Sequence, residues 1–252
     1  MNKKNKATQV DFTKVKPYNQ EEEKTAQLAR MFNTISDKYD KFNDIMSWGM
    51  ARMWRKQSLM TLKAYNPQLI LDIAAGTADM CIKSYTYLKP KHVTGVDISD
   101  KMLEMGRIKV ARVNLSDKID LQVQDCSSLQ FADESFDAAT IAFGIRNFEK
   151  LDESLQQIYR VLKTGGHLLI LEMNEPQKGF IYKGYQLYTK IFVRLTAKYL
   201  SSDKVAYDYL TASMHAFPNG KRLIAILEAN GFKLNIYRKF TFGVCSMYLV
   251  QK

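Results

Sequence analysis

From residue 69 onward, short apolar runs alternate with segments in which apolar residues recur every three or four positions. The runs predict strands and the other segments predict helices. Strands are expected at about 69–74, 93–97, 119–124, 137–143, 166–172, 232–239 and 243–250, with helices at about 78–88, 100–113 and 150–162. This alternation predicts an α/β fold with a mostly parallel sheet covered on both faces, and the last two strands are expected at an antiparallel edge.

Two stretches before this pattern read differently. Residues 1–20 are polar and rich in lysine, which predicts a flexible basic tail. Residues 21–64 have helical spacing and predict an N-terminal helical cap, with interruptions near Ser36 and at 47–49. We therefore expect one domain over residues 21–252.

A further segment, residues 179–220, is not needed by the sheet and is expected to form a helical lid. One helical face would be apolar and aromatic, carrying Ile181, Tyr185, Tyr188, Phe192, Leu195 and Tyr199, and the other basic, carrying Lys183, Lys190, Arg194 and Lys198. Such a helix can contact a membrane surface, cover an apolar substrate, or simply pack on the sheet.

The run from Leu69 to Asp79 has the outline of a strand, a tight turn and a helix start that approach a nucleotide cofactor. A dinucleotide loop requires three glycines, whereas this one has only Gly76. The loop suits S-adenosylmethionine better, because this methyl donor has no pyrophosphate and carries a cationic sulfur. An ordinary strand-to-helix turn is the alternative.

Acidic and polar residues follow three of the predicted strands. Asp97 ends the second strand, where a carboxylate in such sheets binds ribose hydroxyls; a turn or cap role is the alternative. Asp125 follows the third strand and can accept from an adenine amino group, or merely cap a loop. Arg146 and Asn147 follow the fourth strand, so we expect them near the reacting groups, although Arg146 could equally form a surface salt bridge.

Composition narrows the possibilities less than the motifs do. With 252 residues and 46% hydrophobic content the chain can bury one substantial core. The net charge of +11 suits nucleic acid, an anionic membrane or solubility. The three cysteines and three histidines have no metal-ligand spacing, so no metal is expected. No apolar run of about 18 residues occurs, and a cytoplasmic, reduced protein is expected.

Longer motifs resemble the ubiquinone/menaquinone biosynthesis C-methyltransferases. The similar segments are 39–47 with Trp54, 143–147, 160–172, 207–210 and Phe217-Pro218. The resemblance implies a Rossmann-like, seven-stranded class I S-adenosylmethionine methyltransferase sheet with N-terminal helices and a helical lid insertion. It also implies C-methylation of a prenylated quinol, with demethylmenaquinol favoured over a polyprenyl benzoquinol. Another small-molecule methyltransferase, a nucleic-acid methyltransferase and a non-catalytic binding module are the competing interpretations.

The resemblance and the strand-end positions together give the expected site residues, and Thr77, Asp97, Asp125 and Cys126 are carried over by position. Arg146, Asn147 and Tyr39 are the expected catalytic residues, with Arg146 stabilising the quinolate or holding a water that takes the proton. The expected cofactor contacts are Asp72, Gly76, Thr77, Asp97, Ile98, Asp125, Cys126 and Ala142, and the expected tail-binding residues are Tyr185, Tyr188 and Phe192. The family usually has a glycine where Ala78 stands. We expect the alanine side chain to tighten the methionine end of the site.

The expected partners follow from the substrate. They are a prenylated quinol and an anionic membrane surface, bound peripherally at the inner face of the cell membrane. The sequence leaves the oligomeric state open, with a homodimer as one alternative. Nucleic acid is not expected as a partner, because no Asn/Asp-Pro-Pro-aromatic run follows the fourth strand to line a flipped-base pocket.

Overall fold

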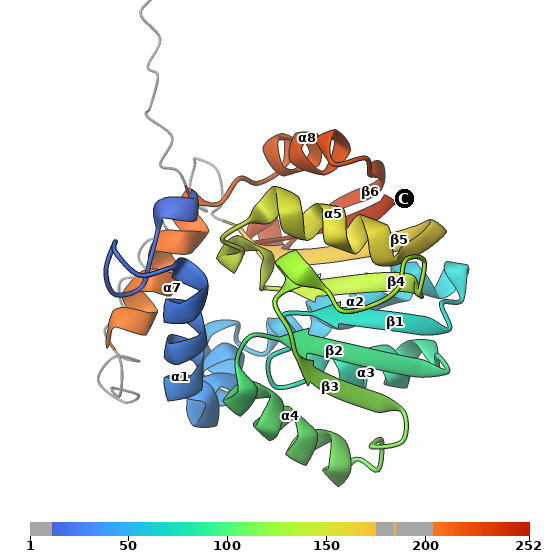
Figure 1. Ribbon diagram of the computed structural model, residues 1–252, viewed down its shortest axis with the longest axis horizontal. Coiled ribbons are helices and arrows are strands. Elements are labelled where there is room, and N and C mark those ends of the chain that lie inside the picture. Colours follow the sequence, from blue (N-terminus) through green and yellow to red (C-terminus); the bar gives the residue numbers. More distant parts are fainter. Residues whose placement is uncertain (1–11, 175–183, 185–203) are drawn as a thin grey trace, which may run out of the picture.

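The computed structural model describes residues 12–174, 184 and 204–252, and its centre is one seven-stranded sheet (Figure 1). The strands are β1 (Leu69–Ile73), β2 (His92–Asp97), β3 (Ile119–Val123), β4 (Phe136–Ala142), β5 (Leu162–Met173), β6 (Lys233–Phe240) and β7 (Cys245–Gln251). Their order is β3-β2-β1-β4-β5-β7-β6, and only β7 runs antiparallel to its neighbours β5 and β6. The predicted α/β sheet with an antiparallel edge is confirmed.

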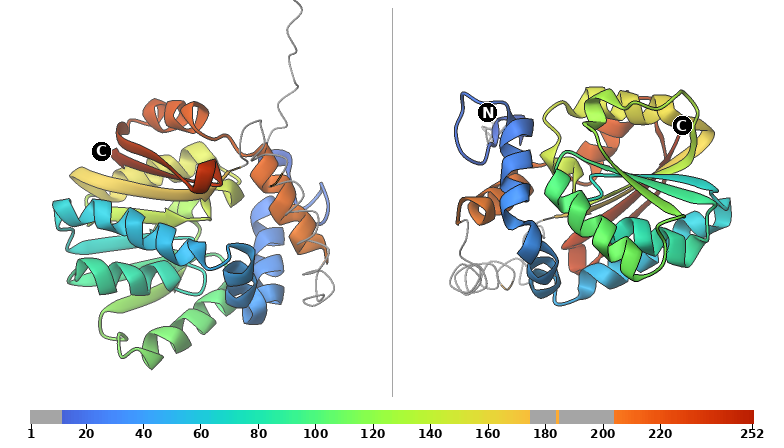
Figure 2. Two further views of the ribbon diagram at one scale, coloured as in Figure 1. Left: turned by 180° about the vertical axis from the view of Figure 1, so that it is seen from behind. Right: turned by 60° about the horizontal axis from the view of Figure 1, so that its bottom comes forward.

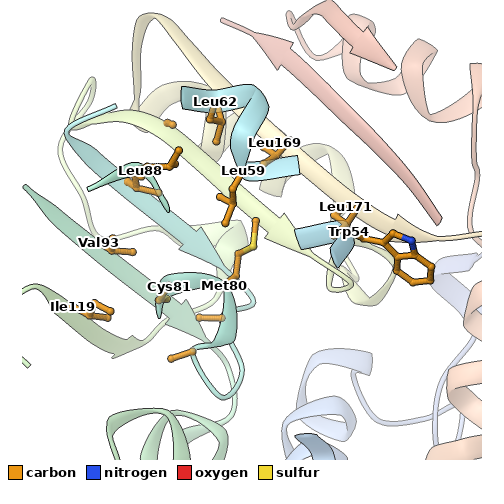
Figure 3. Close-up of a cluster of buried hydrophobic side chains, with 14 of the residues drawn as sticks. Trp54, Leu59, Leu62, Met80, Cys81, Leu88, Val93, Ile119, Leu169 and Leu171 are labelled. Atoms are coloured by element: carbon orange, nitrogen blue, oxygen red, sulfur yellow. The ribbon is translucent and has the colours of Figure 1, made fainter. Parts of the chain in front are cut away.

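Helices cover both faces of the sheet, as the two views of Figure 2 show. One face carries α2 (Met50–Leu62), α3 (Asp79–Leu88) and α4 (Asp100–Arg112), and the other carries α5 (Leu151–Val161) and α8 (Lys221–Ala229). Figure 3 shows the core on the first of these faces, where Leu59 of α2 lies near Leu169 of β5 and Trp54 of α2 lies beside Leu171. Burial of apolar side chains on both faces explains why the strands are nearly continuous apolar runs.

A third layer lies across the carboxyl ends of the strands. It consists of α1 (Lys24–Met46) and α7 (Lys204–Ala216), which lie side by side in both figures. Leu28 and Met31 of α1 pack with Ala206 and Tyr209 of α7 and with Met102 of α4. This layer covers the carboxyl ends of the strands. Within the expected helical lid, α7 is the helix that the structure describes.

Several boundaries differ from the sequence prediction. α1 is unbroken at Ser36, because the Ser36 hydroxyl donates to the Asn33 carbonyl within the helix (3.1 Å) instead of interrupting it. The predicted interruption at 47–49 is confirmed, with positive φ at Trp48 and Gly49. β5 begins at Leu162, earlier than expected, and α8 had not been predicted.

Residues 12–20 were expected to form part of a flexible tail, but they make specific contacts with the domain. The Phe12 ring packs edge-on against Phe217 at 5.2 Å between centroids. The side-chain oxygen of Gln27 accepts from the backbone N–H groups of Tyr18 and Asn19 at 2.8 and 3.1 Å. The tail expectation is therefore wrong for this stretch, whereas residues 1–11 lie outside the described residues.

Candidate active site

A cavity lies where β1, β2 and β4 end and α1 crosses them. The strand order reverses between β1 and β4, and α/β sheets bind ligands at such a switch point. The two loops at this point touch closely, since a Cβ at Gly144 would come within 2.5 Å of the Ala74 side chain. The cavity is lined by Thr25, Phe32, Tyr39, Ile73, Ala74, Gly76, Val96, Asp97, Ile98, Met102, Gln124, Asp125, Cys126, Ser127, Ala142, Phe143, Gly144, Asn147, Phe148, Glu149, Lys150 and Ser154.

Asp97 joins the ends of two strands within this cavity. One carboxylate oxygen accepts from the backbone N–H of Gly76 (2.8 Å) and the other from that of Ser99 (2.9 Å). Burial raises the pKa of Asp97 above its ordinary value, while these backbone donors oppose the shift. A carboxylate has about four lone-pair sites, so Asp97 keeps acceptor capacity for two further hydroxyls.

Asp125 combines the two roles that the sequence left open. Its carboxylate accepts from the backbone N–H of Ser127 (2.8 Å) and so caps the short helix η3 (Cys126–Ser128), yet the residue also lines the cavity. The adjacent Cys126 thiol lies 3.3 Å from the Ser154 hydroxyl, and burial raises its pKa to about 12. Cys126 is therefore a neutral wall of the cavity, and Ile98 and Ala142 complete that wall.

Asp72 was expected in the cofactor site, but its side chain does not line the cavity. It is buried under the sheet end and accepts from Thr140 (2.6 Å) and from the Cys81 thiol (3.1 Å). Burial raises the pKa of Asp72 to about 6. Side chains alternate across a strand, so Asp72 supports β1 and β4 from below the loop.

Thr77 does not line the cavity either. Its hydroxyl donates to Asp40 of α1 (2.5 Å) and accepts from the Lys109 ammonium (3.1 Å). Lys109 also donates to Asp40 and to Asp79 (2.8 and 2.5 Å), so one cation joins α1, α3 and α4. Ala78, the departure noted above, is buried in the core with φ 62°, a conformation that glycine adopts more easily, and it does not reach the cavity.

At the other end of the cavity, polar side chains come from helices. Tyr39 of α1 and Asn147 of η4 (Ile145–Asn147) both line the wall. The Tyr209 hydroxyl of α7 donates to the side-chain oxygen of Asn147 (3.1 Å). Burial raises the pKa values of Tyr39 and Tyr209, so both phenols stay protonated and act as hydrogen-bond donors.

Arg146 lies behind this wall rather than in it. Its guanidinium donates to Glu172 and to the Phe143 carbonyl, both at 2.6 Å, in a nearly dry environment. The salt bridge considered from the sequence thus exists, but it is buried instead of exposed. The Nε–H of Arg146 is also buried and finds no hydrogen-bond partner among the described residues.

Glu172 and Tyr209 are parts of the site that the sequence analysis did not assign. Both lie in segments that carry the family resemblance, and this was the only feature of the sequence that could have pointed to them as site residues. The partners of each, Arg146 and Asn147, stand 26 and 62 residues away along the chain. The expected tail-binding residues Tyr185, Tyr188 and Phe192 lie outside the described residues.

Two kinds of site are absent from the described parts of the chain. No group of three His, Cys, Asp or Glu side chains there could hold a metal ion. Among the same residues, no helix is both long enough and apolar enough to span a bilayer.

Comparison with known proteins points in one direction. The model of the ubiE/COQ5 methyltransferase family matches residues 19–252. A demethylmenaquinone methyltransferase of Bacteroides fragilis is 43% identical over 95% of this chain and 98% of its own length. The protein of that name from Porphyromonas gingivalis is 38% identical over 94% and 97%. A ubiquinone/menaquinone biosynthesis C-methyltransferase of Pseudoalteromonas translucida is 33% identical over 90% and 91%.

Solved structures share the fold at low sequence identity. A methyltransferase from Aquifex aeolicus that depends on S-adenosylmethionine aligns with a TM-score of 0.53 at 14% identity, covering 73% of this chain and 81% of that one. The [4+2]-cyclase SpnF aligns with a TM-score of 0.65 at 14% identity, covering 90% and 96%. These similarities confirm the predicted class of sheet, and because a cyclase is among them they leave the reaction to be argued from the site.

Proposed function

The chain belongs to the ubiE/COQ5 methyltransferase family, and on this premise we propose that it transfers the methyl group of S-adenosylmethionine to a ring carbon of demethylmenaquinol. The observation that carries the proposal is one cavity with two different ends. The strand-built end carries Asp97 and Asp125, and the helix-built end carries Tyr39 and Asn147. Relatives 43% and 38% identical to this chain are named for this activity. A polyprenyl benzoquinol is the second candidate substrate, since the name of a 33% identical relative covers both quinones.

The residues present at the strand-built end fit S-adenosylmethionine. The unused acceptor sites of Asp97 suit the two ribose hydroxyls, and Asp125 with its neighbouring backbone suits adenine. Gly76 lines the cavity and lets the backbone approach a ligand. When bound, the cofactor supplies an electrophilic methyl group on a positively charged sulfur.

The reaction needs an electron-rich ring carbon opposite that methyl group. Loss of a phenolic proton from the quinol raises electron density on the adjacent ring carbon, which then attacks the methyl carbon in line. A carbon–carbon bond forms, the carbon–sulfur bond breaks with its electron pair going to sulfur, and the ring loses a proton to become aromatic again. Holding the two carbons at near-attack distance can be worth about 7–11 kcal/mol of barrier.

Tyr39 and Asn147 are the residues that we assign to contact with the quinol oxygen. Both line the cavity, and the raised pKa of Tyr39 keeps its phenol as a donor. Tyr209 is not assigned to this contact. Its hydroxyl donates to the side-chain oxygen of Asn147, so the Asn147 amide N–H groups remain for other partners. Arg146 would act through its unpartnered Nε–H, by holding a water that receives the proton.

The prenyl tail of the substrate gives the reason for a membrane location. Each buried CH₂ is worth roughly 0.8 kcal/mol, and the net charge of +11 favours an anionic surface. The proposed location of the protein is therefore the cytoplasmic face of the cell membrane, where it binds peripherally. Whether the chain forms a homodimer is tested separately, by sedimentation equilibrium of the purified protein.

The decisive experiment is incubation of the purified protein with methyl-labelled S-adenosylmethionine and a short-tail demethylmenaquinol or demethylated benzoquinol under reducing conditions. Mass spectrometry should show one added methyl group on the ring of the naphthoquinol. Methylation of the benzoquinol alone would keep the chemistry and change the substrate. Failure to methylate either quinol while the cofactor still binds would contradict the proposal.

The Tyr39→Phe variant tests the assignment of the helix-built end. Its turnover should fall while its affinity for S-adenosylmethionine stays close to that of the wild type, because the phenol faces the quinol. Isothermal titration calorimetry measures the affinity and the labelled assay measures the turnover. A loss of affinity with unchanged turnover would place Tyr39 in the cofactor site instead.

A further inference from the structure

Two turns of the molecule present large apolar side chains to solvent. Trp48, in the turn between α1 and α2, is 75% exposed, and Phe242, in the turn between β6 and β7, is 81% exposed. Met53, in the first turns of α2, is 45% exposed. Soluble proteins seldom leave several such side chains together on one surface unless that surface binds something.

The two turns that carry these exposed rings are held against each other. The Thr241 hydroxyl accepts from the Trp54 indole N–H (3.0 Å) and donates to the Met50 sulfur (3.7 Å). Thr241 directly precedes Phe242, and Met50 lies two residues after Trp48. We call the surface formed by Trp48, Met53 and Phe242 the aromatic edge.

Backbone geometry keeps the two rings outward. Trp48 has φ 50° and Phe242 has φ 54°, and each is followed by a glycine that also has positive φ. The left-handed conformation is rare for bulky aromatic residues. A chain under no constraint to expose these rings would more easily carry asparagine or glycine there, so the conformation and the exposure together point to a function of the rings.

Positive charge lies beside the aromatic edge. Arg238 and Lys239 of β6 are exposed, and the Lys239 side chain lies beside Gly243 of the second turn. Arg52 adds a further exposed cation, although it pairs with Asp44. Exposed aromatic side chains next to basic ones match the headgroup region of an anionic bilayer.

The aromatic edge lies at the same end of the sheet as the cavity. Cys245, the first residue of β7 after this turn, pairs with Met173 at the carboxyl end of β5. The cavity is built from the carboxyl ends of β1, β2 and β4, which run parallel to β5. A surface lying against this edge would thus face the end of the sheet where substrate is bound.

We infer that the aromatic edge inserts into the headgroup region of an anionic phospholipid bilayer and so places the cavity at the surface from which a prenylated substrate is drawn. The inference rests on the proposed function, because only a membrane-dissolved substrate gives such docking a purpose. It adds to that function the surface that docks, which includes no residue of the cavity.

Vesicle flotation tests the partner. Wild-type protein should float with vesicles of phosphatidylcholine and phosphatidylglycerol, and the Trp48→Ser/Phe242→Ser variant should partition about tenfold more weakly or worse. The matched control is Ile108→Ser/Val113→Ser, which removes two exposed apolar side chains from α4 and its end and should float like the wild type. Equal flotation of the wild type and the Trp48/Phe242 variant, or no flotation of either, would overturn the inference.

Tryptophan fluorescence tests the depth of insertion, because the chain has two tryptophans in opposite environments. Trp54 is fully buried, whereas Trp48 is exposed. Vesicles of brominated lipid should quench the wild-type emission and leave that of Trp48→Phe, which reports Trp54 alone, nearly unchanged. Unquenched wild-type emission during flotation would mean that another surface binds the bilayer, and this result would overturn the inference.

Activity and mass measurements separate this inference from the proposed function. The Trp48→Ser/Phe242→Ser variant should methylate a short-tail quinol in solution like the wild type but lose activity toward a long-tail quinol held in vesicles. Absence of activity toward both quinols in the wild type would sink the proposed function and not the docking measured by flotation. A wild-type dimer that this variant dissociates would show that the aromatic edge binds a second copy, and would overturn the inference.

Discussion

The two ends of the cavity are built in different ways. At the strand-built end, Asp97 is held by backbone N–H groups from residues that follow β1 and β2 directly. At the helix-built end, Asn147 is held by a side chain of α7 and stands beside an arginine whose charge is balanced by Glu172 on β5. Backbone contacts depend on topology alone, whereas side-chain contacts depend on which residue each helix brings.

This difference separates the general part of the site from the specific part. The fold that creates the switch point is shared with a methyltransferase and a cyclase at 14% identity. Under the proposed function, we expect the choice of substrate to come from the layer of α1 and α7. Four substitutions test this comparison, starting with the one that should have the largest effect.

Glu172→Gln should destabilise the helix-built end, because it leaves the buried Arg146 charge without its carboxylate partner. We expect the free energy of unfolding to fall by about 3–5 kcal/mol, measured by urea denaturation. Arg146→Met/Glu172→Leu should recover much of the loss, since it removes both charges. Lys163→Met, at the more exposed pair with Asp137, should cost less than about 1 kcal/mol.

The same double variant separates folding from chemistry. It should be folded and should bind S-adenosylmethionine. Under the proposed mechanism it should turn over slowly, because it lacks the group proposed to hold the proton-accepting water; a base typically contributes about 10²–10⁴-fold. Wild-type turnover in Arg146→Met/Glu172→Leu would show that Arg146 has only a structural role.

Asp72→Asn should change how the free energy of unfolding depends on pH, because Asp72 is a buried carboxyl group below the strand-built end. Burial raises the pKa of Asp72 to about 6, so the folded protein binds more protons than the unfolded chain between about pH 4 and pH 6. The free energy of unfolding of the wild type should therefore fall relative to Asp72→Asn as pH rises through this window, by up to roughly 3 kcal/mol. Urea denaturation of both proteins across these pH values measures the difference.

Asp137 offers a control of opposite sign. Partial burial opposes ionisation there, but Lys163 and the backbone N–H groups of Leu69 and Gln68 lower the pKa of Asp137 overall. Relative to Asp137→Asn, the wild type should gain stability with rising pH and lose it in acid. A pH-independent difference between wild type and Asp72→Asn would refute the assignment of Asp72 as a buried titrating group.

Asp97→Ala should weaken cofactor binding at the strand-built end, where Asp97 is proposed to accept from the ribose hydroxyls. Hydrogen bonds to a charged group contribute about 1.5–3 kcal/mol, which corresponds to roughly 10- to 150-fold weaker binding of S-adenosylmethionine by isothermal titration calorimetry. Asp100→Ala removes a nearby carboxylate that is largely exposed, and its affinity should stay within about threefold of the wild type. If both variants bound equally well, the ribose site would lie elsewhere.

Tyr209→Phe should produce the smallest effect, confined to the helix-built end. Loss of one neutral hydrogen bond costs about 0.5–1.5 kcal/mol, so turnover should fall by roughly two- to tenfold with unchanged cofactor affinity. Tyr65→Phe, at an exposed tyrosine outside the cavity, is the control. A change in cofactor affinity without a change in turnover would contradict the separation of the two ends.

The strand-built end was largely predictable from the sequence. Asp97 and Asp125 were found because each follows an apolar run at the spacing that a doubly wound sheet requires. Asp72 and Thr77 belong to the same motif but lie outside the cavity, because neighbouring residues of a strand and its turn face opposite sides. Inclusion of these two residues shows that a linear motif locates a loop more reliably than it orients the side chains.

The helix-built end was only partly predictable. Tyr39, Arg146 and Asn147 were singled out, chiefly through the family resemblance, but the burial of Arg146 against Glu172 and the link from Tyr209 to Asn147 were not. These contacts join residues 26 and 62 positions apart, and no local pattern encodes such pairs. Ser36 shows the same limit at short range, since its hydroxyl bonds within α1 instead of ending the helix.

The sequence by itself determined the order of strands and helices, the class of sheet and the acidic residues at the strand ends. These features depend on periodicity and on residues next to each other in the chain, where the energetic preference is local. The tertiary structure alone decided which of the motif residues reach the cavity, which buried charges find a partner, and that the turns carrying Trp48 and Phe242 are held against each other. Those outcomes arise from packing between distant segments, in which each side chain is oriented by neighbours that the linear sequence does not place beside it.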